Sequence, residues 1–189
     1  MERVDTLAVD GVAPDPDEAL ALAARMDPAA FEELYVRYRI AVYRYLRGRA
    51  ATNDEAAELS AVTFERAFRA IARYSPRAGG FRAWLLRIAR NAAIDAARRE
   101  RAAPIVVTDT GHESEPETRV IANESAEDLR ERVAKLPPDQ RDALVLRYSS
   151  GLTAREIGAV LGKSEAASQK LLSRGLDALK EAYRVRPER

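Results

Sequence analysis

The sequence predicts an all-α protein of two small helical domains, an N-terminal helical bundle and a C-terminal helix-turn-helix domain, joined by a flexible acidic linker. Ala, Leu, Arg and Glu dominate its 189 residues, and these side chains lose little freedom in a helix. Apolar residues recur at helical spacing on both sides of residues 102–123. Within that stretch Pro, Gly and acidic residues interrupt the periodicity, which indicates a linker.

The composition restricts the class of protein. The chain is 47% hydrophobic and 32% charged, so it has enough apolar material for a core. It has no Cys, which excludes disulfides and thiolate metal sites. No apolar run approaches the roughly 20 residues of a membrane span, and the N-terminus lacks the pattern of a signal peptide. We therefore expect a cytoplasmic protein with no membrane insertion, no metal and no cofactor.

The net charge of +1 hides a segregation of charge along the chain. Residues 81–101 hold six basic and two acidic residues, and residues 163–189 hold seven and four. Residues 1–20 hold six acidic residues and one basic, and residues 108–131 hold eight and two. Each basic segment alone is equally well explained by a solvated helix face. Two such segments in separate domains favour a two-point contact with a polyanion.

The N-terminal domain is expected over residues 17–101, after a flexible tail at 1–16. Its predicted helices cover 17–26, then a stretch from an Asp27-Pro28 cap to about Gly48, then 53–71 and 81–101. Asn53 or Asp54 is the expected cap of the third helix. Its expected buried face consists of Ala57, Ala61, Phe64, Phe68 and Ile71.

The C-terminal domain is expected over residues 124–189 and contains the sharpest local motif. Thr153 and Glu156 form a capping box, Gly162 falls at a tight turn and Ser164 caps a longer helix. A short capped helix, a Gly turn and a longer capped helix predict a helix-turn-helix. A helical hairpin that does not bind DNA is the alternative. Ser168 lies on the inward stripe of the second helix, where we expect its hydroxyl to bond back to a backbone carbonyl.

In a helix-turn-helix, the N-terminal part of the second helix enters the major groove. Gln can read adenine, Arg or Lys can read guanine, and other basic residues contact phosphates. A favourable interaction with the helix dipole explains Glu165 equally well. The candidate DNA contacts are Arg155, Lys163, Ser164, Glu165, Gln169, Lys170 and Arg174.

The order of motifs resembles one family. The run from Phe81 to Asn91, FRAWLLRIARN, resembles the promoter-melting helix of extracytoplasmic-function sigma factors, and residues 92–101 resemble their −10 recognition segment. Residues 56–64 resemble the segment with which that family grips the polymerase clamp. Residues 134–148 and the helix-turn-helix resemble its second domain, which reads the −35 element. The resemblance covers residues 17–185.

This resemblance implies a transcription initiation factor that binds RNA polymerase core, through the clamp helices of the β′ subunit, and recognises and melts promoter DNA. Residues 17–101 would be sigma domain 2, residues 102–123 the linker and residues 124–189 sigma domain 4. An anti-sigma factor is an expected further partner.

The resemblance also assigns site residues in the first domain. Acidic residues beside exposed apolar ones fit a protein interface, with a solvated helix edge as the alternative. The expected polymerase contacts are Asp54, Glu55, Glu58, Leu59 and Val62. Holding unstacked bases requires aromatic or amide groups near basic ones. The expected −10 contacts are Arg77, Phe81, Arg82, Trp84, Arg87, Asn91, Arg98 and Arg99.

Three of the neighbouring side chains have a structural explanation as well. Core packing explains Trp84 at least as well as DNA contact does. Asn91 lies close to the apolar stripe, so we expect it to need a polar partner. Asp95 is expected to pair with an Arg, since DNA would repel it.

Other functions fit the sequence less well. It has no Gly-rich phosphate loop, no Cys nucleophile and no His-based metal set, so we do not expect an enzyme. A stand-alone helix-turn-helix repressor would bind a palindrome as a dimer and would leave residues 53–64 without a role. A helical adaptor that binds only protein would have no salt-dependent affinity for DNA.

Overall fold

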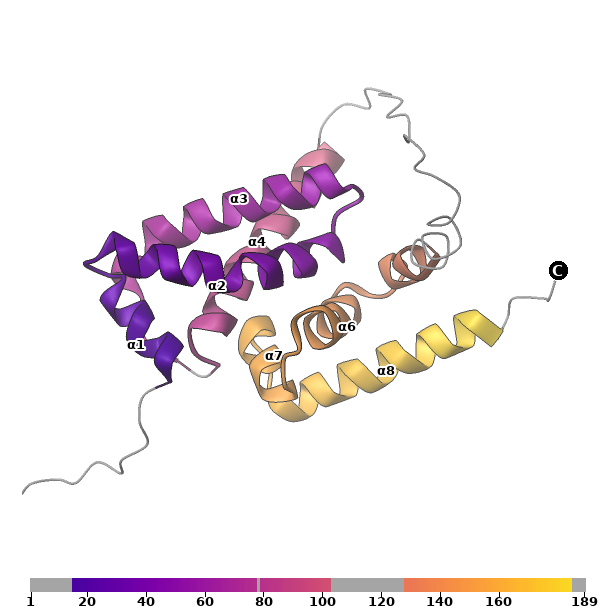
Figure 1. Ribbon diagram of the computed structural model, residues 1–189. Coiled ribbons are helices and arrows are strands. Elements are labelled where there is room, and N and C mark those ends of the chain that lie inside the picture. Colours follow the sequence, from indigo (N-terminus) through magenta and orange to yellow (C-terminus); the bar gives the residue numbers. More distant parts are fainter. Residues whose placement is uncertain (1–14, 78, 103–127, 185–189) are drawn as a thin grey trace, which may run out of the picture.

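A computed structural model describes residues 15–77, 79–102 and 128–184, and these ranges contain helices and no strands (Figure 1). The all-α prediction with two helical domains is therefore confirmed. The predicted tail lies almost wholly outside the described residues, and so does the predicted linker after residue 102. No helix in the described ranges is both long and apolar enough to cross a membrane.

The first domain contains four α-helices and a single 3-10 turn. They are α1 (Pro16–Ala23), α2 (Pro28–Arg47), α3 (Asn53–Ala70), η1 (Ile71–Arg73) and α4 (Gly80–Ala102). As predicted, the Asp27 side chain accepts a hydrogen bond from the Ala29 amide, 2.9 Å away, with Pro28 at the first helical position. The predicted cap of α3 was wrong by one or two residues. Thr52 is the cap, because its hydroxyl accepts from the Glu55 amide at 3.1 Å.

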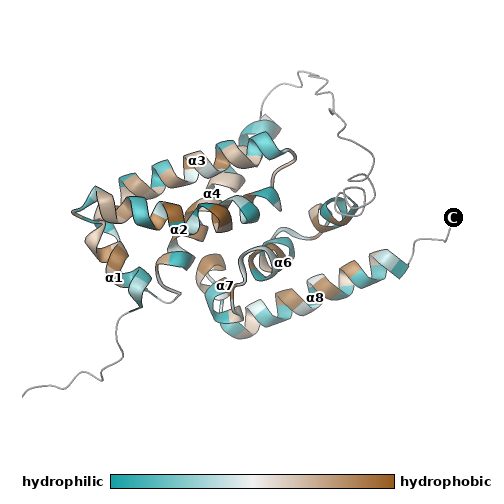
Figure 2. Cartoon of the chain, in the orientation of Figure 1, coloured by the Kyte–Doolittle hydropathy of each residue, from teal (hydrophilic) through white to brown (hydrophobic). Residues whose placement is uncertain are grey.

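The core of the first domain lies where α2, α3 and α4 meet. Large side chains of α2, among them Leu34, Val42 and Tyr45, pack with Phe81 and Leu85 of α4. Both apolar and polar residues lie along each labelled helix in Figure 2, as expected for amphipathic helices around a shared core.

The predicted buried face of α3 was only partly right. Phe64 and Ile71 are buried as predicted, but Ala57 and Ala61 are exposed, and Phe68 is half exposed against Phe31. The residues of α3 that are buried are Ala56, Leu59, Thr63, Phe64 and Ala67. Alanines lie on both sides of this helix, so alanine spacing alone could not distinguish the two faces.

The second domain begins, in its described part, with a helical stretch over residues 128–134. It continues with α6 (Pro138–Ser150), α7 (Ala154–Leu161) and α8 (Glu165–Arg184). Helix α6 ends at Ser150, and its cap residue Gly151 has a φ of 67°, the left-handed conformation that favours glycine.

Local hydrogen bonds build the helix-turn-helix as predicted. The capping box of Thr153 and Glu156 is complete in both directions. Gly162 forms the turn with φ of 68°, and the Ser164 hydroxyl accepts from the Ala167 amide at 3.2 Å. Ser168 is buried and its hydroxyl donates to the Ser164 carbonyl at 3.1 Å, which confirms the expected back-bond.

Gly158 fixes how closely the two helices of this motif approach. A Cβ at this position would lie 2.6 Å from the Lys163 carbonyl oxygen and 3.3 Å from the Ser168 hydroxyl. We expect Gly158→Ala to lower the free energy of unfolding by about 1–2 kcal/mol, since overpacking against backbone outweighs the gain in helix propensity. Chemical denaturation measures this change, and an unchanged or higher midpoint would contradict the close approach.

Candidate nucleic-acid interface

The predicted DNA contacts of the helix-turn-helix lie together on one exposed end of the second domain. Residues 163–165 stand at the start of α8, and Gln169, Lys170 and Arg174 follow on its outward side. Arg155 lies in the first turn of α7, the helix that packs against α8. All seven side chains belong to exposed residues, so we call this set the recognition surface. Lys163 also pairs with Asp139 of α6 at 3.0 Å.

The C-terminal half of α4 presents a second basic surface. Arg98 and Arg99 are exposed there, and so is Asn91. The expected proximity of Asn91 to the apolar stripe was therefore wrong, because α4 turns this residue to solvent. Asp95 pairs with Arg66 of α3 at 2.7 Å, which confirms that it is bound to an arginine.

The N-terminal half of α4 is anchored by an aromatic cluster. Phe81 is only 2% exposed, and its ring centre lies 5.4 Å from those of Tyr38 and Trp84. Trp84 is partly buried and also meets Tyr74 at 5.2 Å. The structure thus gives Phe81 a packing role and leaves only part of Trp84 open to a ligand.

The loop before α4 runs from Tyr74, which is hydrogen-bonded to α1, to two glycines with positive φ. Gly79 and Gly80 have φ of 88° and 62°, a conformation that favours glycine. Tyr74 donates a hydrogen bond to Glu18 of α1 at 2.7 Å. Burial, reinforced by that hydrogen bond, raises the pKa of the Tyr74 hydroxyl above its ordinary value. Arg77 is exposed on this loop.

The predicted polymerase contacts lie on the first half of α3. Asp54 and Glu58 are exposed, and Glu55 and Val62 are half-buried. Leu59 is only 5% exposed, so its expected exposure was wrong. It packs in the core beneath Glu58, and the exposed apolar residues on this half of α3 are Ala57 and Ala61 instead.

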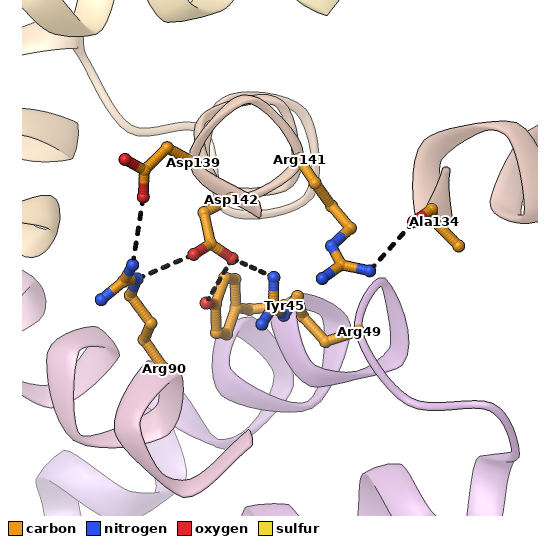
Figure 3. Close-up of polar contacts among 7 residues, drawn as sticks. All are labelled: Tyr45, Arg49, Arg90, Ala134, Asp139, Arg141 and Asp142. Carbon is orange, nitrogen blue, oxygen red and sulfur yellow. Dashed lines mark hydrogen bonds and ion pairs between the residues drawn. The ribbon is translucent and has the colours of Figure 1, made fainter. Parts of the chain in front are cut away.

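The two domains pack against each other, α6 on α2 and α7 on α4 (Figure 1). Figure 3 shows the carboxylate of Asp142, on α6, directed at three groups of the first domain. Arg90 Nε of α4 donates to it at 2.7 Å, Arg49 Nη1 lies 2.5 Å away, and the Tyr45 hydroxyl lies at 3.3 Å. Burial, together with the Asp142 charge, raises the pKa of Tyr45 above its ordinary value.

Two more arginines of α4 reach the second domain. Arg87 Nη2 donates to the carbonyl of Ala159 in α7, and Arg82 lies 3.9 Å from Glu156. Two of the predicted −10 contacts, Arg82 and Arg87, therefore contact the second domain of the protein itself, and so does their neighbour Arg90.

Sequence reasoning missed the cluster around Asp142. One signal was present, because Asp142 directly precedes the apolar run Ala143 to Leu146 and so falls in a buried stretch. A buried carboxylate needs ionic partners, and the sequence did not indicate which arginines would supply them.

Two models of one known protein family match the chain, one in each domain. The family model Sigma-70 region 2 matches residues 34–103, and Sigma-70, region 4 matches residues 126–179. SigD of Mycobacterium tuberculosis, an ECF RNA polymerase sigma factor, is 32% identical over 178 residues, which are 87% of this chain and 82% of SigD. The chain belongs to the extracytoplasmic-function sigma factors.

One further relative and one solved structure are similar to this sigma factor. BldN of Streptomyces coelicolor, also an ECF RNA polymerase sigma factor, is 35% identical over 79% of this chain, and the match spans 59% of the length of BldN. The structure of CnrH in complex with the cytosolic domain of CnrY has a TM-score of 0.73 at 26% identity, covering 92% of this chain and 100% of CnrH. The family consists of transcription initiation factors, which confirms the prediction of that role.

Proposed function

We propose that this sigma factor binds RNA polymerase core through α3 and directs it to promoters by placing α4 at the −10 element and α8 at the −35 element. It has no enzymatic activity and acts in the cytoplasm. The observation that carries the proposal is the recognition surface, where every predicted DNA contact of the second domain is exposed on one end of a helix-turn-helix.

The recognition surface has the chemistry of major-groove reading. Gln169 offers an amide for adenine, and Lys170 and Arg174 offer donors for guanine or phosphate. Arg155 and Lys163 stand at the edge of this surface, where phosphate contacts fix the orientation of a helix without reading bases.

At the −10 element, α4 supplies Asn91, Arg98 and Arg99, with Arg77 on the loop that precedes the helix. The partly exposed ring of Trp84 can stack on an unpaired base. Phe81 acts from beneath by fixing the position of Trp84.

For the polymerase, the exposed acids Asp54 and Glu58 flank small apolar residues on α3. This surface suits the clamp helices of the β′ subunit, with Glu55, Val62 and the buried Leu59 supporting it. An anti-sigma factor is proposed as a further partner, because CnrH, which has the same fold, is held in a complex with a cytosolic protein domain.

Transcription from a library of genomic fragments tests this proposal. Purified core polymerase with the sigma factor is expected to initiate at new sites that share two spaced sequence elements, whereas core alone does not. Absence of new start sites would contradict the proposal, and dimeric binding to a palindrome without polymerase would favour a repressor.

A further inference from the structure

The proposed function gives no role to α1, although this short helix packs on both α2 and α4 (Figure 1). The first turn of α1 contains two acidic residues, Asp17 and Glu18. The Asp17 carboxylate accepts a hydrogen bond from the Tyr38 hydroxyl, and the Glu18 carboxylate accepts one from the Tyr74 hydroxyl. Both tyrosines belong to the buried core. The polar ends of two core tyrosines are thus fixed by one helix.

Both tyrosines pack against the aromatic side chains at the start of α4. The ring centre of Phe81 lies 5.4 Å from that of Tyr38 and 5.7 Å from that of Tyr74. Tyr74 also meets Trp84 edge to face, with ring centres 5.2 Å apart and planes at 69°. Trp84 is the side chain that the proposed function stacks on an unpaired base. A change in the position of Tyr74 would therefore reach this ring directly.

The carboxylate of Glu18 lies between Tyr74 and Gly80, the two ends of the loop that precedes α4. Its Oε1 accepts from the Tyr74 hydroxyl at 2.7 Å, and a Cβ at Gly80 would lie 3.1 Å from its Oε2. Arg25, just after α1, also donates to the Ala72 carbonyl at 3.3 Å. Tyr74 is only 2% exposed, so loss of Glu18 would leave a buried hydroxyl in need of another acceptor. Glu18 therefore determines where Tyr74 lies relative to the start of α4.

We propose that Glu18 is a positioning residue for promoter melting, which holds the Tyr74 ring where it orients Trp84 toward an unpaired base of the −10 element. The role of Trp84 in this inference rests on the proposed function, whereas the contacts that join Glu18, Tyr74 and Trp84 do not. A stacking surface that is fixed before the base arrives loses less freedom on binding. Without Glu18, only a fraction of the molecules presents Trp84 correctly, and the rate of melting falls by that fraction.

The fluorescence of Trp84 tests the positioning in the free protein, because this residue is the only tryptophan of the chain. We expect Glu18→Ala to shift its emission to longer wavelength and to increase its quenching by acrylamide. Tyr74→Phe is expected to cause the same change, and the double variant no more than either single one. Glu18→Gln keeps an oxygen that accepts from the tyrosine hydroxyl, so its emission is expected to match wild type. The matched control is Glu32→Ala, an exposed acid on α2.

Formation of the open complex by the holoenzyme tests the consequence for promoter melting. On a duplex promoter, Glu18→Ala and Tyr74→Phe are each expected to slow it about tenfold, in proportion to the fraction of correctly positioned molecules. Glu18→Gln is expected to retain the wild-type rate. On a promoter whose −10 element is already unpaired, the loss is expected to shrink below about twofold, because no base has to be unstacked. The affinity of both variants for core polymerase is expected to equal that of wild type, which a misfolded domain would not show.

Two results would overturn the positioning role of Glu18. One is wild-type emission and quenching of Trp84 in both Glu18→Ala and Tyr74→Phe, the second of which removes only a hydroxyl and leaves α1 intact. The other is an equal loss on duplex and on unpaired promoters, which would make Glu18 a residue of the fold alone. Failure of the wild type in transcription would instead contradict the proposed function, while the fluorescence of Trp84 would still report whether Glu18 positions this ring.

Discussion

Reversal of the charge at Glu58 is expected to weaken binding of RNA polymerase core by roughly a hundredfold. Glu58 is exposed on α3 beside Ala57 and Ala61, and Leu59 beneath it belongs to the core. At an interface, replacing an attractive charge with a like charge costs several kcal/mol, and each 1.4 kcal/mol is a factor of ten. The affinity of Glu58→Arg for core, measured with a labelled sigma factor, tests this expectation.

The control for this variant is Glu32→Arg, an exposed glutamate on α2 outside the proposed interface. It changes the net charge equally, so non-specific electrostatics would affect both variants alike. Equal affinity of Glu58→Arg and Glu32→Arg for core polymerase would remove α3 from the interface. Leu59 is unsuitable for this purpose, because truncation of a buried leucine by itself costs about 2–5 kcal/mol of stability.

The second large effect is expected at the recognition surface. Lys170→Ala combined with Arg174→Ala is expected to reduce transcription from a promoter with a −35 element by about 30-fold or more. Each base contact by such residues is worth about 1–3 kcal/mol. Each lost phosphate contact also lowers the slope of log affinity against log salt by about one. Binding of the holoenzyme to promoter DNA over a series of salt concentrations measures both quantities.

Helix α8 itself provides the matched control. Lys180 and Arg184 are exposed near its C-terminal end, away from the recognition surface. Lys180→Ala with Arg184→Ala removes the same charge from the same helix. An equal loss in both double variants would show that the helix contributes charge and no specific contact.

The sequence predicted local features more accurately than interactions between distant residues. The helix-turn-helix was predicted in detail because its signals, the Thr153 capping box, Gly162 and Ser164, act over a few residues. The orientation of α3 was not, because it depends on which of its alanines face α2 and α4. Hydrophobic periodicity is weak where alanines lie all around a helix.

In the candidate site too, the features set by local sequence were predicted and those set by contacts between distant residues were not. The recognition surface was predicted from position in one motif, and all of its residues are exposed. Asn91 was misplaced because the rotation of α4 is set by packing of Phe81 and Leu85 against other helices. The pairing of Asp142 with Arg49 and Arg90 joins residues far apart in sequence, across two domains, and no local rule predicts it.

The two domains are expected to bind two separate promoter elements when polymerase is present. The absence of native cysteine allows a DNA-cleaving chelate to be attached at one site, either at Ala166→Cys on α8 or at Ile94→Cys on α4, both exposed. With core polymerase and a promoter found in the library, we predict cleavage near the −35 element from the first position and near the −10 element from the second. Cleavage of one and the same element from both positions would contradict this account.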